Sequence, residues 1–385
     1  MPSTKVDISP NIIDWILKTV SFGELDDKFL SHLYKWKNEE TLPTYAQIES
    51  LSQKTHIPLG YFFLKTPPAE DIPLLKFRTI NSTTGQVPSR DLIDTYYHME
   101  SIQDWMRDYL IDLGNEKLPF VGACKNNTNI EGIADTIRNT AGLSLDWYFQ
   151  SNNADKSFNI ARKYFENIGI IIIRNGVVGQ NNFRPLNIDE FRAFTLIDDY
   201  APLVFINSKD SANGRLFSLF HEIVHIWIGL HSFFNNSSIL SFNISPLETL
   251  CNAVAAELLA PNKIFIREWY DRNHLSVDEK IVAIAKYFTC GKTVIARRAL
   301  GNNFIDQVQY AKIAETAINL FKNEKIKQEG GNYYAAIKQR YGNTFILALD
   351  NSIREGKTLY TEAFKLTNTN RNTFANLVAE VRGFL

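Results

Sequence analysis

The chain has 385 residues, of which 45% are hydrophobic and 22% are charged. This composition is ordinary for a globular protein, excludes a disordered or collagen-like chain, and at this length predicts roughly two or three domains. The 41 basic and 42 acidic side chains leave a net charge of -1, so the chain as a whole has no electrostatic preference for nucleic acid or acidic membranes. Its three widely spaced cysteines exclude a disulfide framework and a thiolate zinc finger.

The amino-terminal residues show no targeting signal. They lack the basic and apolar regions of a signal peptide and the Arg-rich character of a transit sequence. The most apolar run, residues 168–173, is far shorter than the roughly 18 residues that cross a bilayer. We therefore expect a cytoplasmic protein with no membrane partner.

Helical signals dominate the first part of the chain. Ser9 and Pro10 predict a helix start, because serine caps helices and proline suits the first helical position. Residues 42–44 predict the start of another helix. Further on, a long helix is expected from Asp91 to about Leu113.

The middle of the chain changes periodicity. Three strands are expected, at residues 169–173, 191–196 and 203–206, and helices are expected from residue 215 to the end. The predicted fold class is therefore α+β, mostly helical, with a small three-stranded sheet. The expected parts are a helical domain at 1–66, a linker at 67–90, a central domain at 91–300 and a helical carboxy-terminal domain at 301–385.

One motif carries clear chemistry. His221, Glu222 and His225 form a His-Glu-x-x-His pattern inside an apolar helical run. Two imidazoles four residues apart project from one face of a helix, and the glutamate beside the first can reach a water held by the same metal. The pattern predicts a zinc hydrolase with Zn²⁺ as its cofactor and Glu222 as the catalytic base.

A catalytic zinc needs a third protein ligand. His231 lies ten residues after His221, the spacing of the third ligand in metzincins, but that pattern needs glycine at position 228 and a methionine turn. This chain has Ile228, and its last methionine is Met106. The metzincin interpretation is excluded, and we interpret His231 as a surface or cleft histidine.

A glutamate on the next helix is the alternative ligand. Glu248 and Asn252 are four residues apart on one face of a helix that starts at Ser245, so Glu248 can bind the metal and Asn252 can support a ligand by a hydrogen bond. Glu248 could instead close a capping box with Ser245. The ligand interpretation is favoured, because the apolar side of this helix would bury the carboxylate. Glu257 lies about 180° round the helix and is not expected at the same site.

Several stretches resemble the ImmA/IrrE family of zinc metallopeptidases. The resemblance is strong over residues 190–262 and looser over the rest of 9–300. Departures are mild, with Cys251 where the family usually has Ala and Ala193 where it usually has Gly. It rests on residues 190–194, 201–207, 215–225 and 248–261. Residues 36, 42–44, 47–48, 51, 57–58 and 77–78 are similar to the Cro/repressor-type helix-turn-helix of longer members.

The resemblance has implications for the site and for the partner. It implies that Glu248 is the third zinc ligand. It also implies a cytoplasmic endopeptidase of bacteria and their mobile elements whose substrates are often helix-turn-helix repressors, so that cleavage would switch on stress, transfer or defence genes.

The predicted mechanism assigns further roles. Zinc would lower the pKa of its water to about 7, and Glu222 would accept the proton and deliver it to the leaving amine. The strand at 203–206 is expected to form a sheet edge on which an extended substrate pairs. Tyr200, Arg215 and His231 are candidate oxyanion stabilisers.

DNA binding is not favoured. Residues 1–66 contain seven lysines, no arginine and eight acidic residues, and such a module is poorly equipped to contact phosphates. A second helix-turn-helix-like segment is expected at 276–300 and is more basic, with Lys286, Lys292, Arg297 and Arg298.

The alternative to an enzyme is a regulatory protein with a structural zinc that acts on DNA or on a repressor without cutting it. The presence of Glu222 favours the enzyme interpretation, because a purely structural zinc site does not need a catalytic base.

Overall fold

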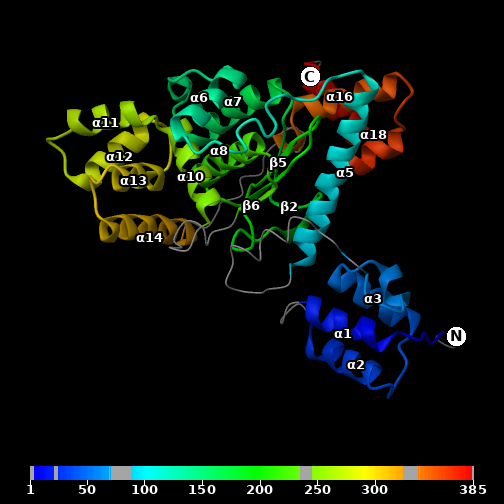
Figure 1. The fold of residues 1–385 in the computed structure, drawn as a ribbon. Coiled ribbons are helices and arrows are strands. Elements are labelled where there is room, and N and C mark those ends of the chain that lie inside the picture. Colours follow the sequence, from blue (N-terminus) through cyan, green and yellow to red (C-terminus); the bar gives the residue numbers. More distant parts are fainter. Residues whose placement is uncertain are drawn as a thin grey trace. The chain divides into compact units, whose positions relative to one another are not determined.

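The computed structural model divides into two compact units, Met1–Tyr97 and His98–Leu385 (Figure 1). It describes residues 4–20, 25–68, 70, 88–234, 245–323, 337 and 339–383. Most of the predicted linker at 67–90 lies outside these ranges, and so do residues 77–78 of the helix-turn-helix resemblance.

The first unit has an amino-terminal bundle of short helices. They are α1 (Pro10–Thr19), α2 (Asp27–Lys37), α3 (Tyr45–Thr55) and the 3₁₀ helix η1 (Leu59–Phe63). The predicted starts at Pro10 and after Thr44 are confirmed. Thr44 forms a capping box with Gln47, in which each side chain binds the other residue's backbone N–H. Trp36 and Phe62 are buried with aliphatic residues of all three α-helices in a core that belongs to this unit alone.

A long helix, α5 (Arg90–Asp112), follows, close to the expected bounds. The second unit is mostly helical. Its further α-helices are α6 (Ile130–Ala141), α7 (Ala154–Asn167), α8 (Ala212–Ile228), α10 (Pro246–Leu259), α11 (Asn262–Asp271), α12 (Val277–Tyr287), α13 (Lys292–Gly301), α14 (Gln307–Asn323), α16 (Asn343–Arg354), α17 (Tyr360–Thr367) and α18 (Arg371–Val381), with the 3₁₀ helix η2 (Trp147–Gln150). None of the described helices is both long enough and apolar enough to cross a membrane.

A mixed sheet lies at the centre of the second unit. Its strands are β1 (Ile171–Asn175), β4 (Ala193–Leu196), β5 (Leu203–Asn207) and β6 (Ser232–Phe234), in the order β1-β5-β4-β6. β1 pairs with β5 in parallel, and the other two pairs are antiparallel. A separate hairpin contains β2 (Val177–Val178) and β3 (Asn181–Pro185). The mostly helical α+β fold class is confirmed.

Two expectations about the sheet were wrong. The strand predicted as an edge, 203–206, is β5, which pairs on both sides and offers no free edge to a substrate. Every residue of β5 is buried, as is typical of an interior strand. The chain after residue 215 is not all helical, because β6 adds a fourth strand after α8. Three residues are too few to show a strand's alternating pattern.

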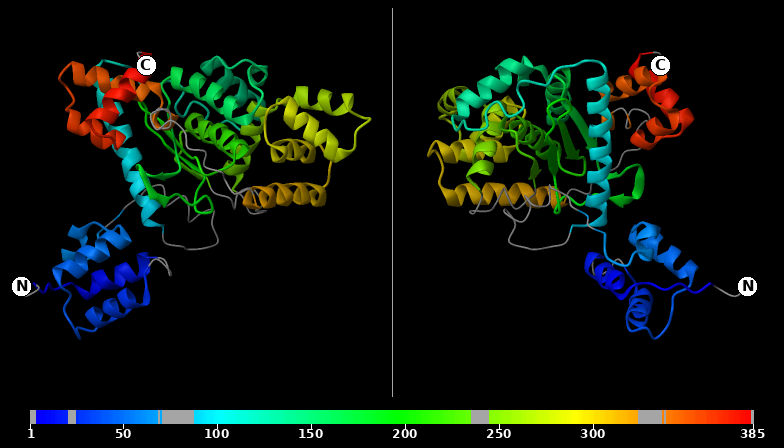
Figure 2. Two further views of the ribbon diagram at one scale, coloured as in Figure 1. Left: turned by 180° about the vertical axis from the view of Figure 1, so that it is seen from behind. Right: turned by 45° about the vertical axis from the view of Figure 1, so that its right-hand side comes forward.

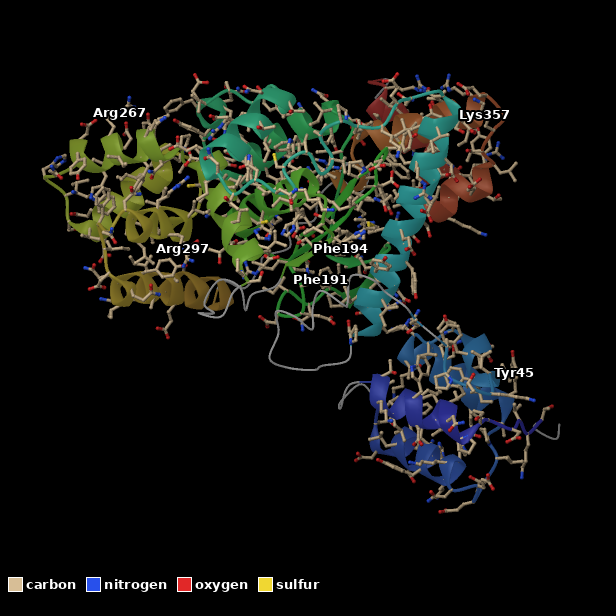
Figure 3. All side chains as sticks on the ribbon, in the orientation of Figure 1. Tyr45, Phe191, Phe194, Arg267, Arg297 and Lys357 are labelled. Atoms are coloured by element: carbon tan, nitrogen blue, oxygen red, sulfur yellow. The ribbon has the colours of Figure 1, made fainter. Side chains whose placement is uncertain are left out.

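The sheet positions the helix that carries the metal-binding motif. Helices α7 and α8 pack beside it (Figures 1 and 2). Alternate residues of β5, Val204 and Ile206, belong to the core shared with these helices. Phe205 lies between them in sequence and stacks on Phe194 of β4, with ring centroids 5.0 Å apart. Phe191 joins this pair (Figure 3). Both faces of the sheet are therefore packed, which holds β4 firmly against α8.

Candidate metal centre

The ends of α8 are fixed by its neighbours. At the start, the Ser211 hydroxyl accepts the backbone N–H of Gly214. At the end, Gly229 has a φ of 76° in the left-handed region, and a Cβ there would lie 2.9 Å from the Cα of Gly122. The loop that contains Gly122 also binds the last turn, because the N–H of Gly122 donates to the carbonyl of Ile226 over 2.9 Å. The two histidines are thus held in a helix that cannot easily shift.

Three side chains converge from α8 and α10. The Nε2 atoms of His221 and His225 are 3.2 Å apart, which confirms that the two rings share one helix face. Glu248 reaches them from α10, with Oε2 3.1 Å from Nε2 of His221 and Oε1 3.5 Å from Nε2 of His225. All three residues are buried, and their ligand atoms lie within 4.8 Å of one another.

The geometry decides between the two interpretations of Glu248. The Ser245 hydroxyl accepts the backbone N–H of Glu248 over 3.2 Å, so Ser245 is the helix cap. The Glu248 carboxylate, however, turns to the histidines. Glu257 belongs elsewhere, as expected, because its carboxylate pairs with Arg298 and accepts the N–H of Asn262.

The three donors fit a zinc ion. Bonds of about 2.0–2.1 Å in a tetrahedron separate neighbouring ligand atoms by about 3.3 Å, close to the 3.1, 3.2 and 3.5 Å found here. Two imidazoles and one carboxylate are also the donor set of a catalytic zinc that keeps a fourth position open.

Comparison with known families agrees with this geometry. Residues 179–300 match the model of the IrrE N-terminal-like domain, a peptidase family. The segment holds an IrrE-type metallopeptidase domain. Residues 341–380 match a second model, a domain of unknown function. No curated protein and no solved structure matches the chain. Neither family match includes residues 1–66, so the helix-turn-helix resemblance there stays a prediction.

Burial and charge set the protonation of the metallopeptidase site. Burial alone would raise the pKa of Glu248, but the hydrogen bond and charge of His221, together with His225, outweigh it and lower the pKa to about 2. For His221 burial acts to lower the pKa, but the hydrogen bond that the imidazole donates to the Glu248 carboxylate, with the charge of that carboxylate, raises it overall. Burial lowers the pKa of His225 to about 3. The carboxylate is therefore ionised and His225 is neutral, as metal ligands must be.

Glu222 lies beside the ligands and is fully buried. Burial raises its pKa to about 7, and a hydrogen bond from Thr195 opposes the shift. The Thr195 hydroxyl donates to Oε2 of Glu222 over 2.5 Å. Oε1 makes no hydrogen bond of good geometry within the described residues, although the nearby Ser232 hydroxyl also acts to lower the pKa of Glu222. One carboxylate oxygen is thus held by the protein, and the other remains for a reacting group.

Thr195 is a site residue that the sequence interpretation missed. It lies on β4, where every residue is buried. Its single hydroxyl in an apolar strand was the available signal in the sequence. A buried hydroxyl needs a hydrogen-bond partner, so this residue had to contact another polar group. The pattern could not name that partner, since Glu222 is 27 residues further along the chain.

Asn252 has the supporting position that its spacing predicted. Its side chain hydrogen-bonds His221 and helps to raise the pKa of that imidazole. The backbone of Leu230 acts in the same direction on His225. A hydrogen bond of this kind, from a residue outside the cluster, orients the ring of a metal ligand.

The three candidate oxyanion stabilisers occupy different places. Nδ1 of His231 accepts the backbone N–H of Ile197 over 3.1 Å, so His231 contacts the end of β4 and is not among the three clustered ligands. Tyr200 lies in the turn before β5, where its N–H donates to the carboxylate of Asp198. Arg215 binds Asp155 and the carbonyl of Ser208. These contacts give Arg215 a structural role at the start of α8, and the oxyanion assignments stay predictions.

The segment predicted at 276–300 contains α12, a turn and α13. Two of its basic side chains are engaged within the protein. Arg298 pairs with Glu257 and donates to the carbonyl of Ala260, and the Arg297 guanidinium lies 5.3 Å from the ring centroid of Tyr310. These two arginines therefore have partners within the protein, and their presence does not require a nucleic-acid ligand.

Proposed function

We propose that the protein is a zinc-dependent endopeptidase of the cytoplasm that cuts a specific protein at a specific site. The observation that carries the proposal is the position of Glu222, buried next to the convergent His221, His225 and Glu248. A structural zinc site needs no such base. Three protein ligands also leave a fourth position for a reactant.

The residues divide the chemical work among them. His221, His225 and Glu248 would hold the zinc, which when bound supplies a Lewis acid that activates water near neutral pH. Glu222 accepts the proton of the attacking water at its carboxylate and passes it to the amine nitrogen of the broken peptide bond. Thr195 is a positioning residue that keeps the carboxylate turned toward the reaction.

The proposed substrate is a helix-turn-helix transcriptional repressor. The resemblance to the ImmA/IrrE family supports this, since members often cleave such repressors. Cleavage would then regulate stress, mobile-element or defence genes. The amino-terminal helices with their own core would serve in substrate selection, which suits a module with no arginine in residues 1–66.

The test is incubation of the zinc-loaded protein with the helix-turn-helix protein encoded beside it. Metal content is measured by mass spectrometry, and the products are identified by intact mass. We expect cleavage at one bond, and none after chelation of the zinc. A Glu222→Gln protein should hold the same zinc and leave the substrate whole.

Two results would contradict the proposal. Normal cleavage by Glu222→Gln protein would show that Glu222 is not the base. Tight binding of the repressor without any cleavage would favour a regulatory protein whose zinc is structural.

A further inference from the structure

A groove of about 720 Å³ lies in the carboxy-terminal helices, outside the peptidase match. Its walls come from α16, α17 and α18. Most of its lining lies within residues 341–380, which match a family model of their own. These three helices therefore lie in a segment whose family match is separate from that of the metallopeptidase domain.

One face of α18 forms the length of the groove. Arg371, Ala375, Val378 and Arg382 line it at intervals of four, three and four residues, which places them in one stripe along the helix. The stripe is apolar in the middle and has an arginine at each end. Arg382, the residue that caps α18, follows Arg371 by eleven positions, so their Cα atoms lie about 16 Å apart along the helix.

Aromatic side chains form the opposite wall. Tyr360 and Phe364 are one turn apart on α17, with ring centroids 5.9 Å from each other. Phe364 also contacts Phe374 of α18 edge to face, again at 5.9 Å. Tyr360 is 58% exposed although it is large and apolar over most of its surface. An apolar partner that covered this wall would gain from the burial.

The groove carries an excess of positive charge. Arg354, Arg371 and Arg382 line it against one acid, Asp350. Asp350 holds Arg354 at 2.9 Å and Arg382 at 2.5 Å, which orients both guanidinium groups. Arg371 is exposed and forms no ion pair in the part of the chain that the structure describes. The charge balance of three to one favours an anionic partner.

The groove faces away from one of the contacts that anchor these helices. Phe345 of α16 packs edge to face on Trp105 of α5, at 5.8 Å. Asp350 follows Phe345 by five residues, which is about 140° round the helix. The face that lines the groove is thus distinct from the face that holds α16 in the second unit. Lys357 marks the connection between α16 and α17 in Figure 3.

We propose that α16, α17 and α18 bind an acidic amphipathic helix of a partner protein. Its apolar residues would lie on Ala375, Val378 and the aromatic wall, and carboxylates near its two ends would bind Arg371 and Arg382. A helix of about 11 residues spans the distance between these arginines, whereas a small organic anion reaches only one. Binding of an amphipathic helix in an apolar groove is a common mode of peptide recognition.

The experiment uses the full chain with Glu222→Gln, so that cleavage cannot consume the probe. The probe is a fluorescent Ala-based helical peptide of about 14 residues with Leu on one face and Glu at both ends, and binding is followed by anisotropy. We expect saturable binding that weakens with salt. Absence of peptide binding would contradict the groove proposal but not the proposed protease activity, because cleavage is measured in a separate experiment with active protein.

Variants test the two features of the groove. Arg371→Gln should weaken binding about tenfold, since it removes a charge-assisted hydrogen bond. Ala375→Glu, at an exposed position, places a carboxylate in the groove and should abolish binding. Lys365→Gln removes an exposed charge of α17 that is absent from the lining, and should bind as before. Thermal melting confirms that each variant is folded.

Three outcomes would overturn the proposal. Binding that is unchanged in both Arg371→Gln and Ala375→Glu would place the peptide elsewhere. Equal binding of a peptide with Gln in place of Glu would remove the role of charge. Saturable binding of benzoate, with no binding of the peptide, would make the groove a small-molecule site.

Discussion

The Thr195 hydroxyl of β4 donates a 2.5 Å hydrogen bond to the Glu222 carboxylate of α8. The bond links the sheet to the metallopeptidase helix at the residue that would move the proton. It occupies Oε2, whereas Oε1 makes no hydrogen bond of good geometry among the described residues. Catalytic groups act best when a neighbour fixes their orientation.

Replacement of Thr195 by valine should therefore lower catalysis without loss of the metal. Valine keeps the shape but removes the donor, and a hydrogen bond to a charged group contributes about 1.5–3 kcal/mol. We expect kcat/KM to fall about 10- to 100-fold with unchanged zinc content. Thr195→Ser retains the hydroxyl and should recover most of the activity. An unaltered rate in Thr195→Val would show that the bond is only structural.

Glu248 can be tested as a ligand by comparison with its own helix cap. Glu248→Gln replaces the carboxylate by a neutral amide and should weaken zinc binding at least 100-fold, measured by competition with a chelator. Ser245→Ala removes the cap, which costs about 1 kcal/mol of folding free energy, but should leave zinc affinity nearly unchanged. Equal zinc affinity of the Glu248→Gln and wild-type proteins would show that Glu248 is no ligand.

Gly229 should be sensitive to the smallest substitution. Gly229→Ala combines a left-handed φ with a Cβ 2.9 Å from the Cα of Gly122. We expect a loss of at least about 2 kcal/mol in the free energy of unfolding, from strain and from the displaced loop. Gly356→Ala is the matched control, because its φ is 71° but open space surrounds its Cβ position. If urea denaturation gave similar losses of unfolding free energy for the two variants, the clash with Gly122 would not be the cause.

His98 should make the second unit sensitive to acid. Burial lowers the pKa of His98 in the folded protein, and its Nε2 lies 2.9 Å from the carbonyl of Leu366. A lowered pKa means that the stability it provides is present above the unfolded value of about 6.5 and is lost as the pH falls through the folded value. We expect the melting temperature to decrease more between pH 7.5 and pH 5 in the wild type than in His98→Gln. Parallel pH curves for the two proteins would contradict this.

The order of the strands had to come from the folded chain. The predicted strands at 169–173, 191–196 and 203–206 exist with slightly shifted bounds, because alternation and β-branched content are local signals. Which strand lies at the edge depends on hydrogen bonds between distant segments. β6, which pairs with the outer edge of β4, was missed because three residues are too few to show a strand's alternation.

At the metal site, too, the local sequence predicted some features and long-range packing decided the others. The spacing of His221 and His225, and of Glu248 and Asn252, determined which side chains share a face, since a helix repeats every 3.6 residues. Only the packing of α10 on α8 decided that the Glu248 carboxylate turns to the histidines rather than to its own helix cap. The contact of Thr195 with Glu222, and the arginines that line one groove from α16 and α18, likewise join residues far apart in sequence. Local periodicity predicts faces of helices and strands, whereas the choice of which faces meet depends on burial over the whole fold.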